Sequence, residues 1–394
     1  MRVNVCVNGT FRYPDYIRFY EQAGILNRFY FAHRRSQTPA VLGLPTERTH
    51  NLWLKQYLMA AAFRSAPDCL SAPLSRALCD RFQQGVLKRW QPCDSLEAVI
   101  GAVADHVIAF ARREGTKVLG HPVTTQCATV RRLVDQARAD LGLAPDRTML
   151  AEAARRGDEV AACDALVVDS GFVARSFVAA GVPAERISVV RPGFDPVRFH
   201  PRDLSEVDRE TFLVVCVGIV TPRKAQHVLL RAWRMLNLPK AKLVLVGALG
   251  RDARAVIRGH EGTFSHIPHV PHGALRSLLA RASCFVLSSA EDGFAQAPLE
   301  AMACGVPTIL SETVGAAELI EHGRTGFVVP TFDPEAIAAV LERLYRDRTL
   351  GESVGHAASV ARRDAGTWPD YAGQVIALHR RLTGDTSTSA RAAA

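Results

Sequence analysis

The sequence predicts an α/β protein of two domains, each built on a parallel sheet with helices on both faces. Its 394 residues are too many for a single hydrophobic core. Short apolar runs alternate with helical patterns in both halves of the chain, which is typical of doubly wound parallel sheets. The polar stretch FDPVRFHPRDLSEVDRE interrupts this alternation, so we place the interdomain linker near residues 196–210.

The first half opens with a strand and continues as alternating helices and strands. Ser170 is an N-cap residue, and Gly181 is the glycine that commonly follows a helix end. The expected elements are a strand over 3–7, a helix over 95–113, a strand over 117–119, a helix over 125–141, a strand over 164–169, a helix over 170–180 and the strand ISVVRPG.

The second half repeats the pattern as a complete doubly wound domain. The small and polar residues of TGDTSTSARAAA predict a frayed terminus. The expected elements are strands over 212–218, 242–247, 284–288, 306–310 and 326–329, and helices over 227–236, 273–282, 297–303 and 333–346.

Composition excludes several protein classes. The chain is 48% hydrophobic and 22% charged, as in folded globular proteins. We find neither an apolar run of the roughly 18 residues that span a membrane nor a signal-peptide core at the start, so we expect a cytoplasmic protein. The nine cysteines lack metal or CxxC spacing. His266, His269 and His272 have no cysteine or carboxylate among them, so we expect no metal site.

Positive charge is concentrated in the first quarter of the chain. Residues 1–92 hold thirteen Lys and Arg against five Asp and Glu, a net charge of +8, interleaved with aromatic residues. An anionic membrane surface would attract such a face, and so would nucleic acid. The alternative is a solvated basic face over an aromatic core. Because nucleic-acid binding rests on charge alone, we expect no nucleic-acid partner.

The segment from Cys284 to Leu310 carries the clearest chemical signal. An apolar strand runs into a loop with Asp292 and Gly293, and the loop runs into a helix that carries Glu300. The N–H groups at a helix start bind anions, and glycine allows close backbone approach. A diphosphate could therefore lie at this helix start, while the two carboxylates accept hydrogen bonds from sugar and ribose hydroxyls.

A second segment, CVGIVTPRKAQHVLLRAW, places two cations at a helix mouth. Gly218 ends the expected strand, and Arg223 and Lys224 follow a turn. In an open α/β sheet, ligands bind at the carboxyl edge of the strands. Cations there can hold a diphosphate and stabilise it as it leaves.

In these motifs the chain resembles glycosyltransferase family 4 and its relatives, which have the GT-B fold of two facing Rossmann-like domains. Three stretches carry the resemblance in the family's order: DALVVDSGFVARSFVAAGVPAERISVVRPGFDPVRFHP, VGIVTPRKA and DGFAQAPLEAMACGVP. It implies an acceptor-binding domain over 1–199, a donor-binding domain over 200–366, a helix over 367–383 that crosses back to the first domain, and a disordered tail over 384–394.

The resemblance also implies roles for individual residues. His121, Lys224 and Asp292 are the expected catalytic residues, with His121 facing the acceptor and Lys224 contacting the diphosphate. Glu300 is expected to hold the ribose. The donor-binding set is Gly9, Thr10, Gly218, Arg223, Lys224, Asp292, Gly293, Phe294, Ala295, Gln296 and Glu300.

The chain departs from the family's pattern at four positions near this site. Asp292 stands where the family usually has glutamate, and Ile219 stands where it has arginine. Ala225 and Ala295 stand where it has glycine. Arg223 is a candidate to replace the missing cation.

The implied activity is that of a retaining glycosyltransferase. A sugar would pass from a nucleotide diphosphate donor to a glycan or lipid-linked acceptor of an envelope polysaccharide, with no cofactor and no metal required. Such an enzyme would work in the cytoplasm or on the inner face of the cell membrane. Two alternatives stay open: a catalytically silent GT-B protein that binds nucleotide sugars or polyanions, and a non-hydrolysing nucleotide-sugar epimerase.

Overall fold

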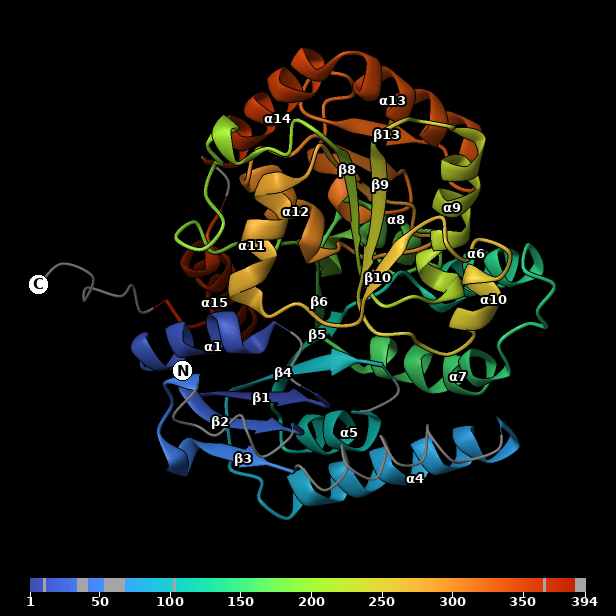
Figure 1. The fold of residues 1–394 in the computed structure, drawn as a ribbon. Helices are drawn as coiled ribbons and strands as arrows, with labels where there is room; N and C mark the ends of the chain where they lie inside the picture. The colour runs from blue at the N-terminus through green and yellow to red at the C-terminus, as the bar shows by residue number, and fades with distance from the viewer. Residues whose placement is uncertain (10–11, 34–41, 53–67, 102–103, 364–365, 387–394) are drawn as a thin grey trace, which may run out of the picture.

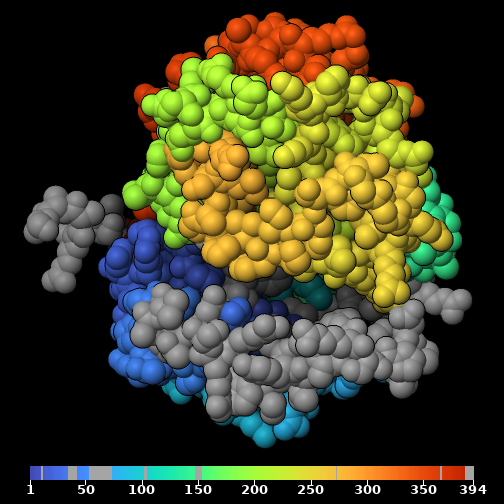
Figure 2. All heavy atoms as spheres, viewed as in Figure 1, coloured from blue at the N-terminus to red at the C-terminus, as the bar shows by residue number. Residues whose placement is uncertain are grey.

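The computed structural model has two parallel-sheet α/β halves stacked on one another (Figures 1 and 2). The description below covers residues 1–394 except 10–11, 34–41, 53–67, 102–103, 364–365 and 387–394. The two-domain, doubly wound α/β fold predicted from the sequence is confirmed. Thr10, one of the expected donor-binding residues, lies outside the described residues.

The N-terminal sheet has seven parallel strands within the described part of the chain, in the order β3-β2-β1-β4-β5-β6-β7. Its strands are β1 Val3–Val7, β2 Leu26–Phe31, β3 Thr49–Asn51, β4 Ser95–Ile100, β5 Lys117–Pro122, β6 Ala165–Val168 and β7 Ile187–Val189. Its helices are α1 Tyr13–Gln22, α4 Asp68–Leu87, α5 Asp105–Arg113, α6 Cys127–Ala139, α7 Arg147–Ala162 and α8 Gly171–Val178, with 3-10 turns η1 Thr46–Arg48 and η2 Ala184–Arg186.

The C-terminal sheet has six parallel strands among the described residues, in the order β10-β9-β8-β11-β12-β13. Its strands are β8 Phe212–Val217, β9 Ala241–Val246, β10 Ser265–Ile267, β11 Cys284–Leu287, β12 Thr308–Ser311 and β13 Phe327–Val329. Its helices are α9 Gln226–Met235, α10 Ala253–Ile257, α11 His272–Arg281, α12 Gln296–Ala303, α13 Pro334–Arg346 and α14 Arg348–Arg363, with 3-10 turns η3 Leu204–Glu206, η4 Pro222–Lys224 and η5 Gly315–Leu319.

Local sequence explains why the main elements form where they do. All five residues of β1, VNVCV, are buried, as expected for a central parallel strand covered on both faces. The Ser170 hydroxyl accepts a hydrogen bond from the Val173 N–H and so caps α8. Asp333 caps α13 in the same way, through the N–H of Ala336.

The last helix, α15 Trp368–Thr383, packs on the N-terminal half beside α1 (Figure 1). The Trp368 ring stacks on Tyr16, with ring centroids 6.3 Å apart, and Tyr371 meets Tyr16 edge-on at 4.9 Å. Residues of α15 therefore belong to the same buried cluster as β1 and α1. The C-terminal segment completes the core of the first domain.

One predicted helix is wrong. Residues 95–113 form strand β4 followed by helix α5, not one helix. All six side chains of β4, SLEAVI, are buried in the sheet. Tertiary packing outweighs local helix propensity at this strand, because the Glu97 carboxylate finds partners on α1 and α15. Strands β2, β3 and β10 were not predicted.

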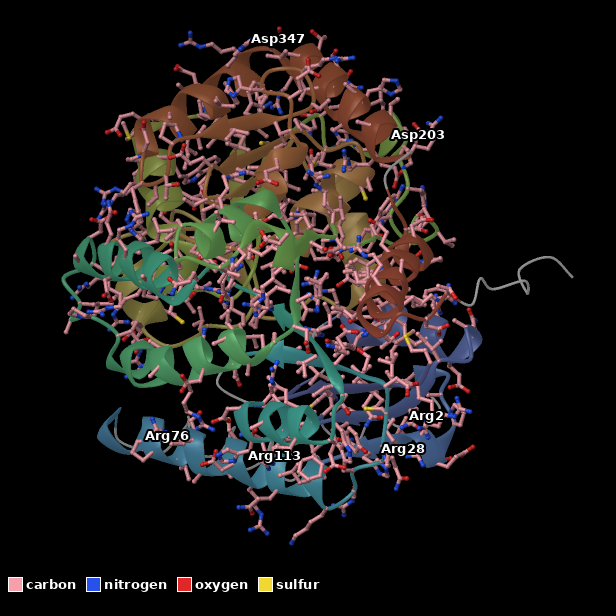
Figure 3. All side chains as sticks on the ribbon, turned by 180° about the vertical axis from the view of Figure 1, so that it is seen from behind. Arg2, Arg28, Arg76, Arg113, Asp203 and Asp347 are labelled. Atoms are coloured by element: carbon pink, nitrogen blue, oxygen red, sulfur yellow. The ribbon has the colours of Figure 1, made fainter. Side chains whose placement is uncertain are left out.

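The first-quarter aromatic residues that the structure describes belong largely to the core. Tyr13, Tyr16 and Tyr20 are fully buried on α1, and Phe29 and Phe31 stack in β2 at 4.7 Å. Of the first-quarter basic residues, Arg2, Arg76, Arg81, Lys88 and Arg89 are exposed, and Figure 3 labels Arg2 and Arg76 on the N-terminal half, whereas Arg12 is partly buried and pairs with Asp169. Within the described ranges, no helix combines the length and the apolar character needed to cross a bilayer.

Gly193 should not tolerate a side chain, because a Cβ there would lie 2.4 Å from the Thr367 carbonyl carbon and the Trp368 nitrogen. We expect Gly193→Ala to lower the free energy of unfolding by about 1–3 kcal/mol through overpacking. Gly373→Ala on α15 is the control, because nothing lies within 4 Å of that Cβ. Alanine there should stabilise the helix by about 0.5–1 kcal/mol. The urea midpoints of the two variants measure these changes in stability. Equal midpoints for Gly193→Ala and Gly373→Ala would contradict the close packing of Gly193 against Thr367 and Trp368.

Candidate functional site

The site lies at the carboxyl edge of the C-terminal sheet, between the two strands from which the chain adds further strands in opposite directions. Strands β8 and β11 are neighbours at the centre of this sheet, and the chain leaves β8 toward β9 on one side and β11 toward β12 on the other. Such a switch point opens a crevice at the carboxyl ends of the two strands. The loops after β8 and β11 hold Gly218, Arg223, Lys224 and residues 292–295, so both sequence motifs meet at one edge.

Two ion pairs join the β8 and β11 loops. The Lys224 ammonium pairs with the Asp292 carboxylate, and the Arg223 guanidinium contacts the Glu291 carboxylate at 3.1 Å. Burial alone would raise the pKa of Asp292, but the charges of Lys224 and Arg223 outweigh it and lower that pKa below its usual value. Asp292 is therefore a carboxylate at neutral pH.

Two alanines hold backbone conformations that favour glycine. Ala225, between η4 and α9, has φ 46°, and Ala295, before α12, has φ 65°. These are two of the positions where the resembling family has glycine. Both alanines are therefore strained, at a cost of about 1–3 kcal/mol per position.

Glu300 is a buried carboxylate on α12 that forms no hydrogen bond or ion pair with any described residue. It is 8% exposed. Burial, with a contribution from the nearby charge of Asp15 on α1, raises the pKa of Glu300 to about 7, against a smaller opposing effect of Arg198. An ionised buried carboxylate without donors is costly, so Glu300 is a candidate for a position where a ligand supplies donors.

The N-terminal domain contacts the loop between β11 and α12 directly. The loop between β5 and α6 lies against Gly293, where a Cβ would approach the Val123 carbonyl oxygen to 2.6 Å. The Ser170 hydroxyl donates to the Gly293 carbonyl at 2.7 Å. The backbone N–H and hydroxyl of Thr125 donate to Glu291 at 2.9 and 3.1 Å. The two domains are therefore closed onto each other at this loop.

His121 lies in a buried polar network of the N-terminal domain. Its Nε2 is 3.3 Å from Asp169, and its Nδ1 is 3.6 Å from Glu97. Asp169 also pairs with Arg12. Burial lowers the pKa of His121, but the carboxylates of Asp169 and Glu97 outweigh burial and raise it overall. Both ring nitrogens thus face carboxylates of their own domain.

Glu97 is the centre of this network. Its carboxylate accepts hydrogen bonds from the hydroxyls of Tyr13, Tyr16 and Tyr20 at 3.0, 2.8 and 2.7 Å. His379 of α15 lies 3.3 Å from its other face. Hydrogen bonds and positive charge from His121 and His379 outweigh burial and hold the pKa of Glu97 well below its usual range.

The remaining expected residues take several positions. Gly9 follows β1 with φ 142°, and Gly218 follows β8 with φ 157°. Phe294 is buried. Gln296 begins α12 and donates its side-chain amide to the Gly193 carbonyl at 2.9 Å, so it ties α12 to the interdomain segment. Ile219, at the position of the family's arginine, is 54% exposed.

Sequence reasoning missed Glu291, Thr125, Glu97 and Asp169. Asp169 and Thr125 each follow an N-terminal strand, which is a usable signal. Glu291 stands beside Asp292, but nothing in the local pattern shows which of two adjacent acids faces Arg223. Glu97 was hidden by the wrong helix prediction.

The described residues bring together one cluster with metal-ligand chemistry, formed by Asp80, Asp105 and His106. Arg155 forms ion pairs with Asp80 and Asp105, at 2.8 and 2.7 Å, so its guanidinium already balances the negative charge of the two carboxylates. His266 Nε2 lies 2.7 Å from the Gly247 carbonyl oxygen. The expected absence of a metal requirement stays a prediction.

Comparison with known proteins connects this site to glycosyltransferases. Residues 201–360 match the family described as glycosyl transferases group 1. The amylovoran biosynthesis glycosyltransferase AmsK of Erwinia amylovora is 31% identical over 179 residues, which cover 42% of this chain and 44% of AmsK. A D-inositol 3-phosphate glycosyltransferase of Jonesia denitrificans is 29% identical over 222 residues, covering 50% of this chain and 52% of that protein. The chain thus matches about half the length of these curated relatives.

Solved structures show the fold. HepE of Anabaena in complex with UDP superposes with a TM-score of 0.68 at 16% identity, covering 96% of this chain and 99% of HepE. Sucrose-phosphate synthase of Thermosynechococcus elongatus gives 0.70 at 17% identity, covering 98% and 100%. The chain has the GT-B fold.

Glu300 should make stability depend on pH. Because its pKa rises from 4.5 to about 7 on folding, the neutral form is favoured in the folded state. The contribution of Glu300 to the free energy of unfolding is fully present below pH 4.5. It falls by about 3 kcal/mol as the pH rises through 7. We expect the urea midpoint of wild type to fall relative to Glu300→Gln between pH 4.5 and 7.5. A constant difference between the two proteins over that range would rule out the raised pKa.

Proposed function

We propose that the chain is a retaining glycosyltransferase that moves a sugar from a nucleotide diphosphate donor to a glycan or glycolipid acceptor. The match of residues 201–360 to glycosyl transferases group 1 supports the reaction class. The observation that carries the proposal is the buried, unpartnered carboxylate of Glu300 on α12, the helix that follows the loop in which Asp292 pairs with Lys224.

In this proposal the C-terminal domain holds the donor. The diphosphate lies at the start of α12, where free N–H groups and the helix dipole favour an anion, and Lys224 and Arg223 add fixed positive charge. The Glu300 carboxylate accepts hydrogen bonds from the ribose. Asp292 and residues 293–296 hold the sugar.

The proposed chemistry uses the donor's own phosphate. The nucleoside diphosphate leaves from the face that the acceptor hydroxyl attacks, and its phosphate oxygen takes the hydroxyl proton. The bond from the anomeric carbon to the phosphate oxygen breaks, and a bond to the acceptor oxygen forms on the same face. Lys224, Arg223 and the helix start stabilise the leaving charge, so no metal is required.

His121 fits this chemistry as a cation rather than as a base. The carboxylates of Asp169 and Glu97 raise its pKa and favour the protonated ring. A protonated imidazole cannot take the acceptor's proton, which agrees with a phosphate oxygen in that role. We assign His121 to the acceptor side of the cleft, where its charge favours the departing diphosphate.

A silent nucleotide-sugar or polyanion-binding protein is the second candidate, and two observations favour it. Ile219 is exposed where a cation is expected, and Arg223 already forms an ion pair with Glu291. A non-hydrolysing epimerase would need acid and base pairs in the cleft. Transfer of the sugar, with analysis of the product linkage, separates the three functions.

A nucleotide screen tests the donor site. We expect one of UDP, GDP, ADP or their sugar conjugates to bind wild type in isothermal calorimetry and to raise its melting temperature. Glu300→Ala should weaken that binding at least tenfold, because the ribose loses a charged hydrogen-bond partner. Glu342→Ala, an exposed residue of α13, is the control. If none of these nucleotides binds, the donor site proposed here is wrong.

We further propose that the enzyme works at the inner face of the cell membrane, with the basic N-terminal domain against anionic lipid. Helix α4 and the residues after it expose Arg76, Arg81, Lys88 and Arg89. Arg76 lies at the outer edge of that half in Figure 3. Each basic residue near an anionic surface contributes about 1 kcal/mol.

Liposome flotation tests this surface. We expect wild type to float with vesicles rich in phosphatidylglycerol at moderate salt and to stay unbound with neutral vesicles. Replacing Arg81 and Lys88 by Glu should reduce the bound fraction at least tenfold. The matched control replaces Arg254 and Arg258, which are exposed on the other domain. Equal binding by both variants would exclude α4 as the membrane surface.

A further inference from the structure

Glu291 is a fully buried carboxylate beside the donor site, and its two oxygens face different domains. One oxygen, Oε1, accepts the backbone N–H and the hydroxyl of Thr125 at 2.9 and 3.1 Å. The other, Oε2, contacts the Arg223 guanidinium at 3.1 Å. Thr125 belongs to the N-terminal domain, whereas Arg223 belongs to the C-terminal domain. A single side chain therefore connects the first domain to a cation of the second.

The geometry leaves Glu291 little freedom when the domains are closed. Two donors from Thr125 fix one oxygen, so the other oxygen has a defined direction toward Arg223. The backbone N–H groups of Ala290 and Glu291 point to the Arg223 carbonyl oxygen at 2.9 and 3.5 Å, which holds the two loops together. The Arg223 side chain stays 35% exposed, so the ion pair with Glu291 does not bury it completely.

The surrounding packing makes this contact depend on closure. Any Cβ at Gly293 would meet the Val123 carbonyl oxygen at 2.6 Å, so the β5–α6 loop lies directly on the donor-site loop. Moving the domains apart would withdraw Thr125 from Glu291, because Thr125 moves with the N-terminal sheet. Glu291 would then lose both fixed donors and could turn about its last side-chain bond.

We propose that Glu291 is a positioning residue that couples domain closure to the orientation of Arg223. Thr125 supplies the contact to Glu291 that depends on closure. This inference rests on the proposed function in one respect, namely that Arg223 acts on the leaving diphosphate. In the closed form, Thr125 fixes Glu291, and Glu291 directs Arg223 toward the phosphate. In an open form, Arg223 is not directed, so the donor's phosphate is not activated before the acceptor cleft has closed.

Thr125→Val is the sharpest test, because valine keeps the shape and the backbone N–H but removes the hydroxyl donor. We expect kcat for donor hydrolysis, with the nucleotide sugar that binds wild type most tightly, to fall about tenfold, while KM for that donor changes less than threefold. Thr116→Val is the matched control. Its hydroxyl is buried but bonds the Cys93 carbonyl within the N-terminal domain, so kcat should stay within twofold of wild type.

A double-mutant cycle with Arg223→Ala separates positioning from general destabilisation. If Thr125 acts through Glu291 and Arg223, adding Thr125→Val to Arg223→Ala should change kcat by less than twofold. A tenfold loss that persists in the Arg223→Ala background would overturn the coupling. So would a Thr125→Val enzyme with wild-type kcat.

Small-angle scattering supplies a readout that does not need catalysis. Thr125→Val and Glu291→Gln should give a larger radius of gyration than Thr116→Val, because the closed form loses a charge-assisted contact. An unchanged radius for both variants would overturn the link to closure even if no substrate were known. Wild type that closes normally but binds and hydrolyses no nucleotide sugar would instead refute the proposed function.

Discussion

The site depends on one topological constraint, the reversal of winding between β8 and β11. Because all strands of the sheet are parallel, their following loops emerge at one edge, and only at the reversal do two neighbouring loops diverge to leave a crevice. Lys224 reaches this edge from the first strand of the domain and Asp292 from the fourth. Residues 68 positions apart thereby form an ion pair. The N-terminal sheet has the same reversal, between β1 and β4, and Gly9 follows β1 there.

The parts of the fold that were predicted from the sequence are those whose information is local. Runs such as VNVCV and FLVVCV are continuous and apolar, so their burial as parallel strands follows from composition, and Ser170 and Asp333 mark helix starts through their own side chains. The strand over 95–100 was missed because Glu97 is stabilised by three tyrosines more than 75 positions away. No local pattern carries that information.

The candidate site shows the same division. Arg223, Lys224, Asp292 and Glu300 were identified because they lie in short motifs beside strand ends. Glu291 and Thr125 were missed because their pairing requires the relative placement of two domains. The departures at Ala225 and Ala295 have a physical interpretation only in the structure, where both residues have positive φ. Alanine at these two positions adds local strain to the loops.

The position of α15 also has a consequence for biosynthesis. His379 reaches Glu97 and Ser95, and Trp368 and Tyr371 pack against Tyr16 of α1, so the first domain is built partly from a segment that is translated after the second domain. While the ribosome is still making the second domain, α1 has an uncovered apolar face, and Glu97 lacks one of its partners. The second domain, whose buried cluster lies within residues 194–354 apart from Ala137, can pack first. The core of the first domain can therefore be completed only after the second domain and α15 have been synthesised.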